Sequence, residues 1–257
     1  MKQKIKQFLR GPLERVLQNE CSLAVWWVSA AHKRLKWIQW RILPQPEHFD
    51  HYIDLFYQWR ASRNSQWVER GVFGGLALKS DGQVLELACG DGFNARNFYS
   101  LRSKSVTACD FDPSAIRTAK QKNPAPNITY LLADIRTAMP QGSFDTVVWD
   151  AAIEHFTPDE IKKVLNDIKH RLKTGGTLTG YTIVEKKNGT KSLEHHEYEF
   201  KNKEDLARFL TPHFKNVTVF ETLYPDRHNL YFWASDGDLP LTSAWPHSLH
   251  FSHEEKH

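Results

Sequence analysis

Cysteine is scarce in this chain, which has only Cys21, Cys89 and Cys109 among its 257 residues. An odd number of cysteines cannot form a complete disulfide framework, and two of the three fall at the ends of expected buried strands. This usage is typical of reduced thiols, so we expect a cytoplasmic protein. Cysteine-rich elements and nucleic-acid-binding motifs are also missing, so we expect no nucleic-acid partner.

Long apolar runs are missing as well. The most apolar stretch near the N-terminus, residues 23–28, is much shorter than the roughly 20 residues that span a bilayer. Hydrophobic residues make up 40% and charged residues 25% of the chain, the balance of an ordinary folded protein. The length suits one sizeable α/β domain with an extension.

Basic residues are concentrated at the N-terminus. The whole chain has a formal net charge of +4, but residues 1–41 hold nine Lys or Arg and two acids, which leaves −3 for the remainder. This segment also has helical apolar spacing and tryptophans at 26, 27, 37 and 40. It is either an interfacial helix with Trp and basic groups at the lipid headgroups or a helical cap whose tryptophans pack on the core. We favour the cap, because amphipathic helices mostly bury a face.

Residues 84–92, with the sequence Val-Leu-Glu-Leu-Ala-Cys-Gly-Asp-Gly, organise the rest of the chain. Their apolar run predicts a buried strand, and Gly90 and Gly92 predict a tight turn before a helix that begins near Phe93. Glycine lets the backbone approach a ligand closely, and a helix start offers free N–H groups. Strand, turn and helix therefore predict a corner that binds a nucleotide-like ligand.

The strands that follow alternate with helices. Expected strands cover residues 105–110, 128–133, 144–149 and 177–184, then 216–223 and 229–234. Alternation predicts a Rossmann-like, doubly wound, mostly parallel sheet. The last two strands are joined by a turn too short for a parallel crossover, so they form an antiparallel C-terminal pair in a seven-stranded sheet.

Four regions follow from this pattern. They are a basic, Trp-rich helical extension (1–45), a helical cap (46–80), the α/β domain (81–235) and a flexible tail (236–257). Prolines at 44 and 46 separate the first two regions. The tail contains four histidines whose spacing matches no defined metal site.

Acidic residues stand at the strand ends. Asp110, Asp134 and Asp150 follow the second, third and fourth strands, at the edge where open α/β sheets bind ligands. The glycine turn also fits a dinucleotide pattern with Asp110 placed for a ribose, so an NAD-dependent oxidoreductase is an alternative. Glu86 and Asp91 oppose it, because two acids repel a pyrophosphate and suit a cationic ligand.

Six segments of this chain together resemble the class I S-adenosylmethionine-dependent methyltransferases, in family order and at family spacing over about residues 80–235. They are residues 84–92, 109–114, 132–135, 144–148, 153–155 and 172–176. The resemblance implies a methyltransferase, a transferase enzyme that uses S-adenosyl-L-methionine as its cofactor.

The resemblance also implies which residues bind this cofactor. Glu86, Gly90 and Gly92 would surround its methionine part, although Glu86 could instead orient the turn. Asp110 would hold the ribose hydroxyls, which suits a carboxylate because it accepts two hydrogen bonds.

The third and fourth strand ends would complete the site. Asp134, with the backbone of Ile135, would meet the adenine, whose amino group is a donor. Asp150 would line the site near the methionine part or the acceptor.

Methyl transfer requires alignment, and it requires a base only where the acceptor must lose a proton. Histidine suits that role because it titrates near neutral pH. We rank His155 first, since Glu154-His155 lies just past a ligand-facing strand end. His195 and His196 in the polar segment after the fifth strand are the other candidates. We expect no metal here, because a His-His-x-Tyr run lacks a convincing set of ligands.

The acceptor is expected to be a small molecule, a sugar or a lipid-linked group that receives the methyl on oxygen or nitrogen. Residues 1–43 add an expectation of peripheral membrane contact. Two alternatives stay open: the NAD-dependent oxidoreductase, and a non-catalytic cofactor-binding protein at a membrane surface.

Overall fold

The computed structural model describes residues 2–38, 41, 64–186, 188–225, 227–239 and 248–250. It divides into two units, residues 1–63 and 64–257. The expected boundary at residue 45 and most of the expected cap lie outside the described residues. Within the described part of the chain, no helix is long and apolar enough to cross a membrane.

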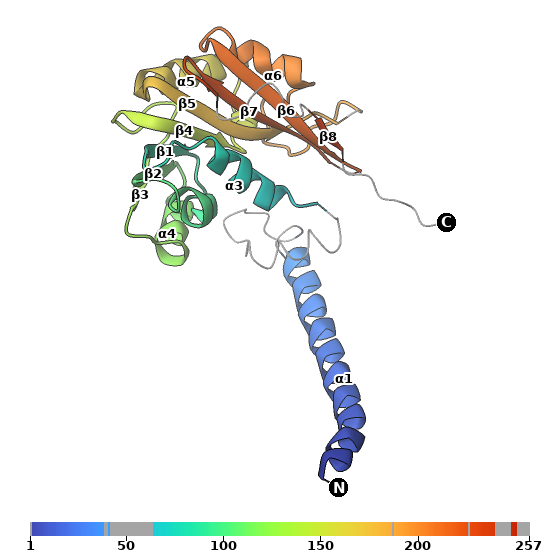
Figure 1. The fold of residues 1–257 in the computed structure, drawn as a ribbon. Coiled ribbons are helices and arrows are strands. Elements are labelled where there is room, and N and C mark those ends of the chain that lie inside the picture. The colour runs from blue at the N-terminus through green and yellow to red at the C-terminus, as the bar shows by residue number, and fades with distance from the viewer. Residues whose placement is uncertain are drawn as a thin grey trace. The chain divides into compact units, whose positions relative to one another are not determined.

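The described part of the first unit is essentially one helix, α1 (Lys2–Trp37), 36 residues long (Figure 1). Lys33 and Arg34 are exposed on it. Trp26, Trp27 and Trp37 are exposed by 58%, 61% and 58%, and the first two rings meet edge to face at 5.0 Å. Large apolar side chains therefore stand on the surface of this helix.

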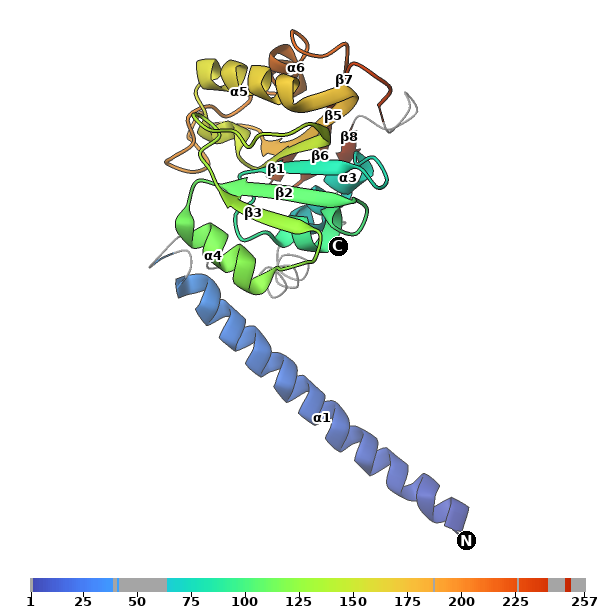
Figure 2. The ribbon, with the colours of Figure 1, turned by 90° about the vertical axis from the view of Figure 1, so that its left-hand side faces the viewer.

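The second unit is built on an eight-stranded sheet with the order β3-β2-β1-β4-β5-β7-β6-β8 (Figure 2). The strands are β1 (Gln83–Leu87), β2 (Ser105–Asp110), β3 (Ile128–Leu132), β4 (Phe144–Asp150), β5 (Leu172–Ile183), β6 (Asn216–Tyr224), β7 (Arg227–Ser235) and β8 (Ser248–His250). Strands β1 to β5 are parallel, and β7 is antiparallel to both β5 and β6. The predicted mostly parallel sheet with an antiparallel C-terminal pair is confirmed.

The structure adds one strand to the seven expected. β8 has three residues and pairs in parallel with β6, whose outer edge otherwise has unpaired backbone groups. At the centre of the sheet, β1 is flanked by β2 and β4. The strand order reverses there, and such a switch point is where open α/β sheets bind ligands.

Helices cover both faces of the sheet (Figure 2). One face carries α5 (Pro158–Arg171) and α6 (Lys203–Leu210), and the other carries α3 (Gln66–Leu76), the π-helix η4 (Ala95–Tyr99) and α4 (Pro113–Lys122). The side chains of β1 alternate between these layers: Leu85 and Leu87 join the core beside α5, and Val84 joins Tyr99 on the opposite face. This alternation fixes the direction of each strand-end side chain.

Local signals explain where α5 begins and ends. Thr157 and Glu160 form a capping box, with Pro158 at the first helical position. At its other end, α5 stops at Arg171, before the glycine pair at 175–176. Leu172 leaves the helix because it pairs with Phe144 at the start of β5.

Helix α3 contains three glycines, Gly71, Gly74 and Gly75. A Cβ at Gly71 would lie 2.2 Å from the ring of Phe98, and one at Gly74 would lie 2.8 Å from the hydroxyl of Tyr99. The glycines allow α3 to approach η4 closely, so packing outweighs their low helix propensity.

Candidate active site

The glycine turn after β1 forms one side of the site. Ala88, Gly90 and Gly92 have φ angles of +54°, +54° and +75°, in the left-handed region that favours glycine. A Cβ at Gly92 would lie 2.4 Å from the Tyr130 hydroxyl, whereas a Cβ at Gly90 would meet nothing within 4 Å. Packing thus requires glycine at position 92, while Gly90 borders open space that a ligand can approach.

Asp110 lies beside this turn, as its position at the end of β2 predicts. Its two carboxylate oxygens accept hydrogen bonds from the backbone N–H groups of Gly90 and Asp112, both at 2.9 Å. Burial raises the pKa of Asp110, and these backbone hydrogen bonds partly offset that rise. The carboxylate is therefore held rigidly at the glycine turn, with lone pairs left for a ligand.

Glu86 is the least satisfied acid of the site. Its side chain is 3% exposed, and among the described residues its Oε2 has no hydrogen-bond partner. Burial raises the pKa of Glu86 well above its ordinary range, and the nearby charge of Asp150 adds to the rise. A buried carboxyl oxygen without a partner is costly unless a donor or cation reaches it. It fits a ligand that carries an ammonium group.

Asp150 does not stand free at the end of β4. Arg70 of α3 donates to its Oδ2 from Nε at 2.8 Å and from Nη2 at 2.5 Å, and Asn94 donates at 3.0 Å. The Arg70 guanidinium also lies over the rings of Trp67 and Tyr181, at 4.9 and 5.0 Å. Asp150 is thus a buried anchor between α3 and the sheet, and its expected place near the methionine part or the acceptor remains a prediction.

Asp134 and Ile135 follow β3. The Asp134 carboxylate accepts from the backbone N–H of Arg136 at 2.9 Å and lies 3.7 Å from the Arg136 guanidinium. Ile135 is buried. The N–H of Ala133 donates to the backbone carbonyl of Asp110 at 2.9 Å. This bond holds the carboxyl ends of β2 and β3 together, next to β1 and its glycine turn.

Three histidines from two segments about 40 residues apart meet beyond the carboxyl end of β4. The rings of His155 and His195 stack at 5.0 Å with an interplanar angle of 8°, and His196 meets His155 edge to face at 4.7 Å. The backbone carbonyl of Glu154 accepts from the N–H groups of residues 197 and 198. All three candidate bases therefore belong to one cluster, held by the 3₁₀ turn η5 (Ile153–His155).

Burial controls the ionisation of this cluster. It lowers the pKa of His155 and of His196, which favours the neutral form of each ring. It also raises the pKa of Glu154, whose carboxylate accepts from the hydroxyl of Thr182 at 3.0 Å. Glu154, His155 and His196 each offer a ligand atom, and these atoms all lie within 4.8 Å of one another.

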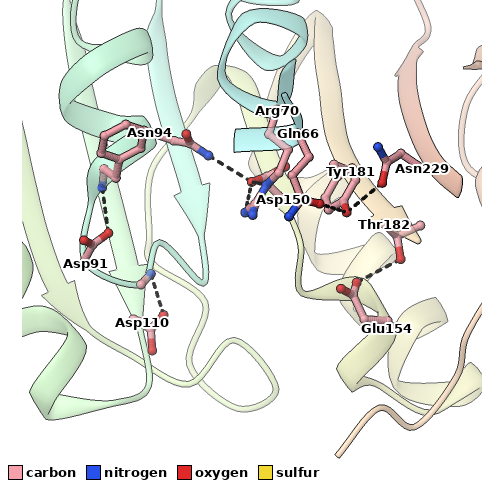
Figure 3. A network of polar contacts seen from close by, with 12 residues as sticks. Gln66, Arg70, Asp91, Asn94, Asp110, Asp150, Glu154, Tyr181, Thr182 and Asn229 are labelled. Atoms are coloured by element: carbon pink, nitrogen blue, oxygen red, sulfur yellow. Dashed lines mark hydrogen bonds and ion pairs between the residues drawn. The ribbon is translucent and has the colours of Figure 1, made fainter. Parts of the chain in front are cut away.

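Figure 3 shows Asp91 and Asp110 on one side of Asp150 and Glu154 on the other. Sequence reasoning missed Arg70 as the partner of Asp150. The two residues are 80 positions apart, and no local pattern joins them.

Residues 84–176 match the family model described as a methyltransferase domain. A malonyl-[acyl-carrier protein] O-methyltransferase of Bacillus anthracis is 28% identical over 97 residues, which are 37% of this chain and 35% of the relative. The chondramide synthase cmdD of Chondromyces crocatus is 35% identical over 119 residues, which are 44% of this chain and 3% of that protein. The chain thus matches about a third of the Bacillus relative.

Solved structures with the same fold include two cofactor complexes. The N-methyltransferase NodS of Bradyrhizobium japonicum, in complex with S-adenosyl-L-homocysteine, has a TM-score of 0.56 and 16% identity, covering 72% of this chain and 93% of its own. Human N-acetylserotonin methyltransferase, in complex with S-adenosylmethionine, has a TM-score of 0.53 and 16% identity, covering 83% and 66%. At these identities the likeness concerns the fold.

Proposed function

Because the chain belongs to the class I S-adenosylmethionine-dependent methyltransferase family, we propose that it transfers the methyl group of S-adenosyl-L-methionine to a small-molecule, sugar or lipid-linked acceptor. The observation that carries the proposal is Glu86, a buried carboxyl group with an unpartnered oxygen beside the open corner at Gly90. The ammonium group of the cofactor would supply the missing partner.

Other residues along the edge would hold the rest of the cofactor. Asp110 would accept hydrogen bonds from the ribose hydroxyls, and Asp134 with the backbone of Ile135 would meet the adenine. The Arg70–Asp150 pair would form the floor towards the acceptor. The bound cofactor supplies a sulfonium methyl group that is already activated for displacement, so the protein contributes mainly alignment.

We assign the binding and deprotonation of the methyl acceptor to the histidine cluster. As the new bond to the methyl carbon forms, the carbon–sulfur bond breaks, its electron pair stays on sulfur, and a hydroxyl or amine acceptor loses a proton. We assign that proton to a ring nitrogen of His155, His195 or His196. Relatives by sequence and fold include an O-methyltransferase and an N-methyltransferase, so oxygen and nitrogen are both kept as accepting atoms.

Calorimetry with S-adenosyl-L-homocysteine tests the cofactor assignment. We expect saturable binding that Asp110→Ala weakens by about tenfold or more, because a hydrogen bond to a charged group is worth roughly 1.5–3 kcal/mol. Asp112→Ala is the matched control: this residue caps α4 by accepting from the N–H of Ser114 at 2.7 Å, so it should cost stability and leave the affinity unchanged. Binding of NADH in place of S-adenosyl-L-homocysteine would favour the oxidoreductase alternative instead.

Turnover separates an enzyme from a non-catalytic cofactor-binding protein. The protein is incubated with methyl-labelled cofactor and a cell extract, and the labelled product is identified. Cofactor binding without any labelled product would favour the binding protein. Recovery of one labelled small molecule, sugar or lipid would identify the acceptor class.

Peripheral membrane contact is a separate part of the proposal. Its support is the exposure of Trp26, Trp27 and Trp37 on α1, together with the excess of basic residues in the same segment. Trp and basic side chains are the groups that favour the headgroup region of a bilayer.

A further inference from the structure

The cluster at Glu154 has the composition of a metal site. Glu154 and His196 are 4% and 2% exposed, His155 is half-buried, and their ligand atoms lie within 4.8 Å of one another. An ion with bonds of about 2.1 Å holds its ligand atoms roughly 3.4 Å apart. Small side-chain rotations would therefore close the cluster around an ion.

Hydrogen bonds fix which nitrogen of each histidine is free. Nδ1 of His196 lies 2.5 Å from Oε1 of Glu199, and Nδ1 of His155 lies 3.3 Å from the backbone carbonyl of His195. Both partners are acceptors, so each Nδ1 carries the proton and each Nε2 has the lone pair. Histidines that bind metals have this same arrangement, with the other ring nitrogen donating to a carboxylate or carbonyl.

The carboxylate is positioned in the same way. Oε2 of Glu154 accepts from Oγ1 of Thr182 at 3.0 Å. The backbone carbonyl of Glu154 is held by the N–H groups of Glu197 and Tyr198, at 2.8 and 3.1 Å. All three groups thus have outer partners that orient them before any ion arrives.

We propose that Glu154, His155 and His196 bind a divalent transition-metal ion beside the acceptor position. Two neutral imidazoles and one carboxylate suit first-row transition ions, whereas calcium and magnesium prefer oxygen ligands. Three protein ligands leave a coordination position open, which is typical of catalytic rather than structural sites.

The role of the ion rests on the proposed function. As a Lewis acid it would polarise an acceptor hydroxyl and ease the loss of its proton. His195, exposed and stacked on His155, is then the histidine left to receive that proton. No metal was expected because the run at residues 195–198 alone lacks a set of ligands. Of the three proposed ligands, only His196 belongs to that run, and Glu154 and His155 come from η5, about 40 residues earlier.

Titration of the metal-free full-length protein with Co²⁺ tests this inference by visible absorption. We expect one equivalent to bind with d–d bands. Glu199→Gln alters the outer partner of His196, a carboxylate that also accepts from the backbone N–H of Ser192 at 2.6 Å. It leaves the three ligands in place and should weaken binding about 10- to 100-fold, and His155→Gln and His196→Gln should weaken it further. His155 is half-buried, so His155→Gln remains informative if His196→Gln fails to fold.

Two controls locate the ion. Exchanging the four tail histidines for glutamine (positions 247, 250, 253 and 257) should leave the d–d bands unchanged, as should His170→Gln at the exposed end of α5. Absence of the bands in the unmodified protein would overturn the inference, and so would bands that survive His155→Gln but vanish in the tail variant. Calorimetry with S-adenosyl-L-homocysteine on the metal-free protein is independent: retained binding keeps the proposed function even where Co²⁺ fails to bind.

Discussion

Glu86 links the folding of this protein to its proposed ligand at the scale of one residue. Burial raises the pKa of its carboxyl group, so the folded protein keeps a proton that the unfolded chain releases above the ordinary value of 4.5. Stability must therefore fall as the pH rises from that value towards the raised pKa, because the folded state then binds more protons than the unfolded state. The acid costs stability at neutral pH, as binding groups often do.

Glu86→Gln should accordingly raise the melting temperature at pH 7–8 and lose this advantage near pH 4, where the native carboxyl group is also neutral. The same change should weaken binding of S-adenosyl-L-homocysteine by roughly 30-fold, since a lost charge-assisted hydrogen bond costs about 2 kcal/mol. Thermal unfolding across pH and calorimetry measure the two effects. Glu204→Gln, on the exposed side of α6, is the control and should change neither. A melting temperature lowered at pH 7–8 would contradict the argument.

Single residues also show the limits of sequence reasoning. The acids at 110, 134 and 150 could be placed because parallel strands bring their carboxyl ends to one edge. Arg70 could not be placed, because its pairing with Asp150 depends on how α3 docks on the sheet. The histidines were each identified as candidates, but their assembly with Glu154 depends on a loop that closes over η5.

Individual strands and helices depend on close backbone approach. Gly180 lies in β5 opposite Trp149 of β4. A Cβ there would lie 2.0 Å from the carbonyl oxygen of Trp149 and 2.5 Å from the ring of Phe232. Backbone on one side and a buried ring on the other leave a side chain no room, so glycine is required at this position in the middle of the sheet.

Gly180→Ala should therefore lower the free energy of unfolding by about 3 kcal/mol, at the upper end of overpacking costs. Gly75→Ala is the matched control, because a Cβ at this position in α3 would meet nothing within 4 Å. Alanine favours a helix over glycine by up to about 1 kcal/mol, so this control should be neutral or stabilising. Urea unfolding measures both variants. Equal stability of the two would show that the sheet adjusts freely at Gly180.

The predictable elements are those with a local signal. β2 lies where its apolar run predicts, and α5 begins at a capping box with proline at the first helical position. The end of α5 and the close approach of the glycine-containing helix α3 have no such local signal, because strand pairing with Phe144 and contact with Phe98 decide them. Those partners are remote in sequence, so propensity alone could not reveal them.

At the scale of the whole molecule, charge divides the chain into two parts. Residues 1–41 carry a net charge of +7 within a total of +4, so the rest is slightly acidic. Acidic groups also crowd the carboxyl edge of the sheet, where Glu86, Asp110 and Asp150 are all buried. The basic extension and the proposed catalytic edge therefore suit partners of opposite charge: an anionic surface for the extension and a cationic cofactor for the edge.

Sedimentation with vesicles tests the first of these partners. We expect the full-length protein to bind vesicles that contain anionic lipid and to lose binding as salt increases, because each basic residue near such a surface contributes about 1 kcal/mol and is screened by salt. Exchanging Lys33 and Arg34 of α1, both exposed, for glutamine removes two charges and should weaken binding roughly 30-fold. The matched control exchanges Lys120 and Lys122, two exposed lysines near the end of α4.

The two pairs of substitutions lower the total charge equally, so they separate local from overall attraction. If α1 is the contact, only the exchange of Lys33 and Arg34 weakens vesicle binding. The double substitution Trp26→Ser with Trp27→Ser should then weaken binding at high salt as well, because salt does not screen apolar burial in the headgroup region. Equal losses from both pairs would mean attraction by net charge alone. Negligible binding with and without residues 1–43 would remove the membrane surface as a partner and leave α1 as a helix that packs against protein.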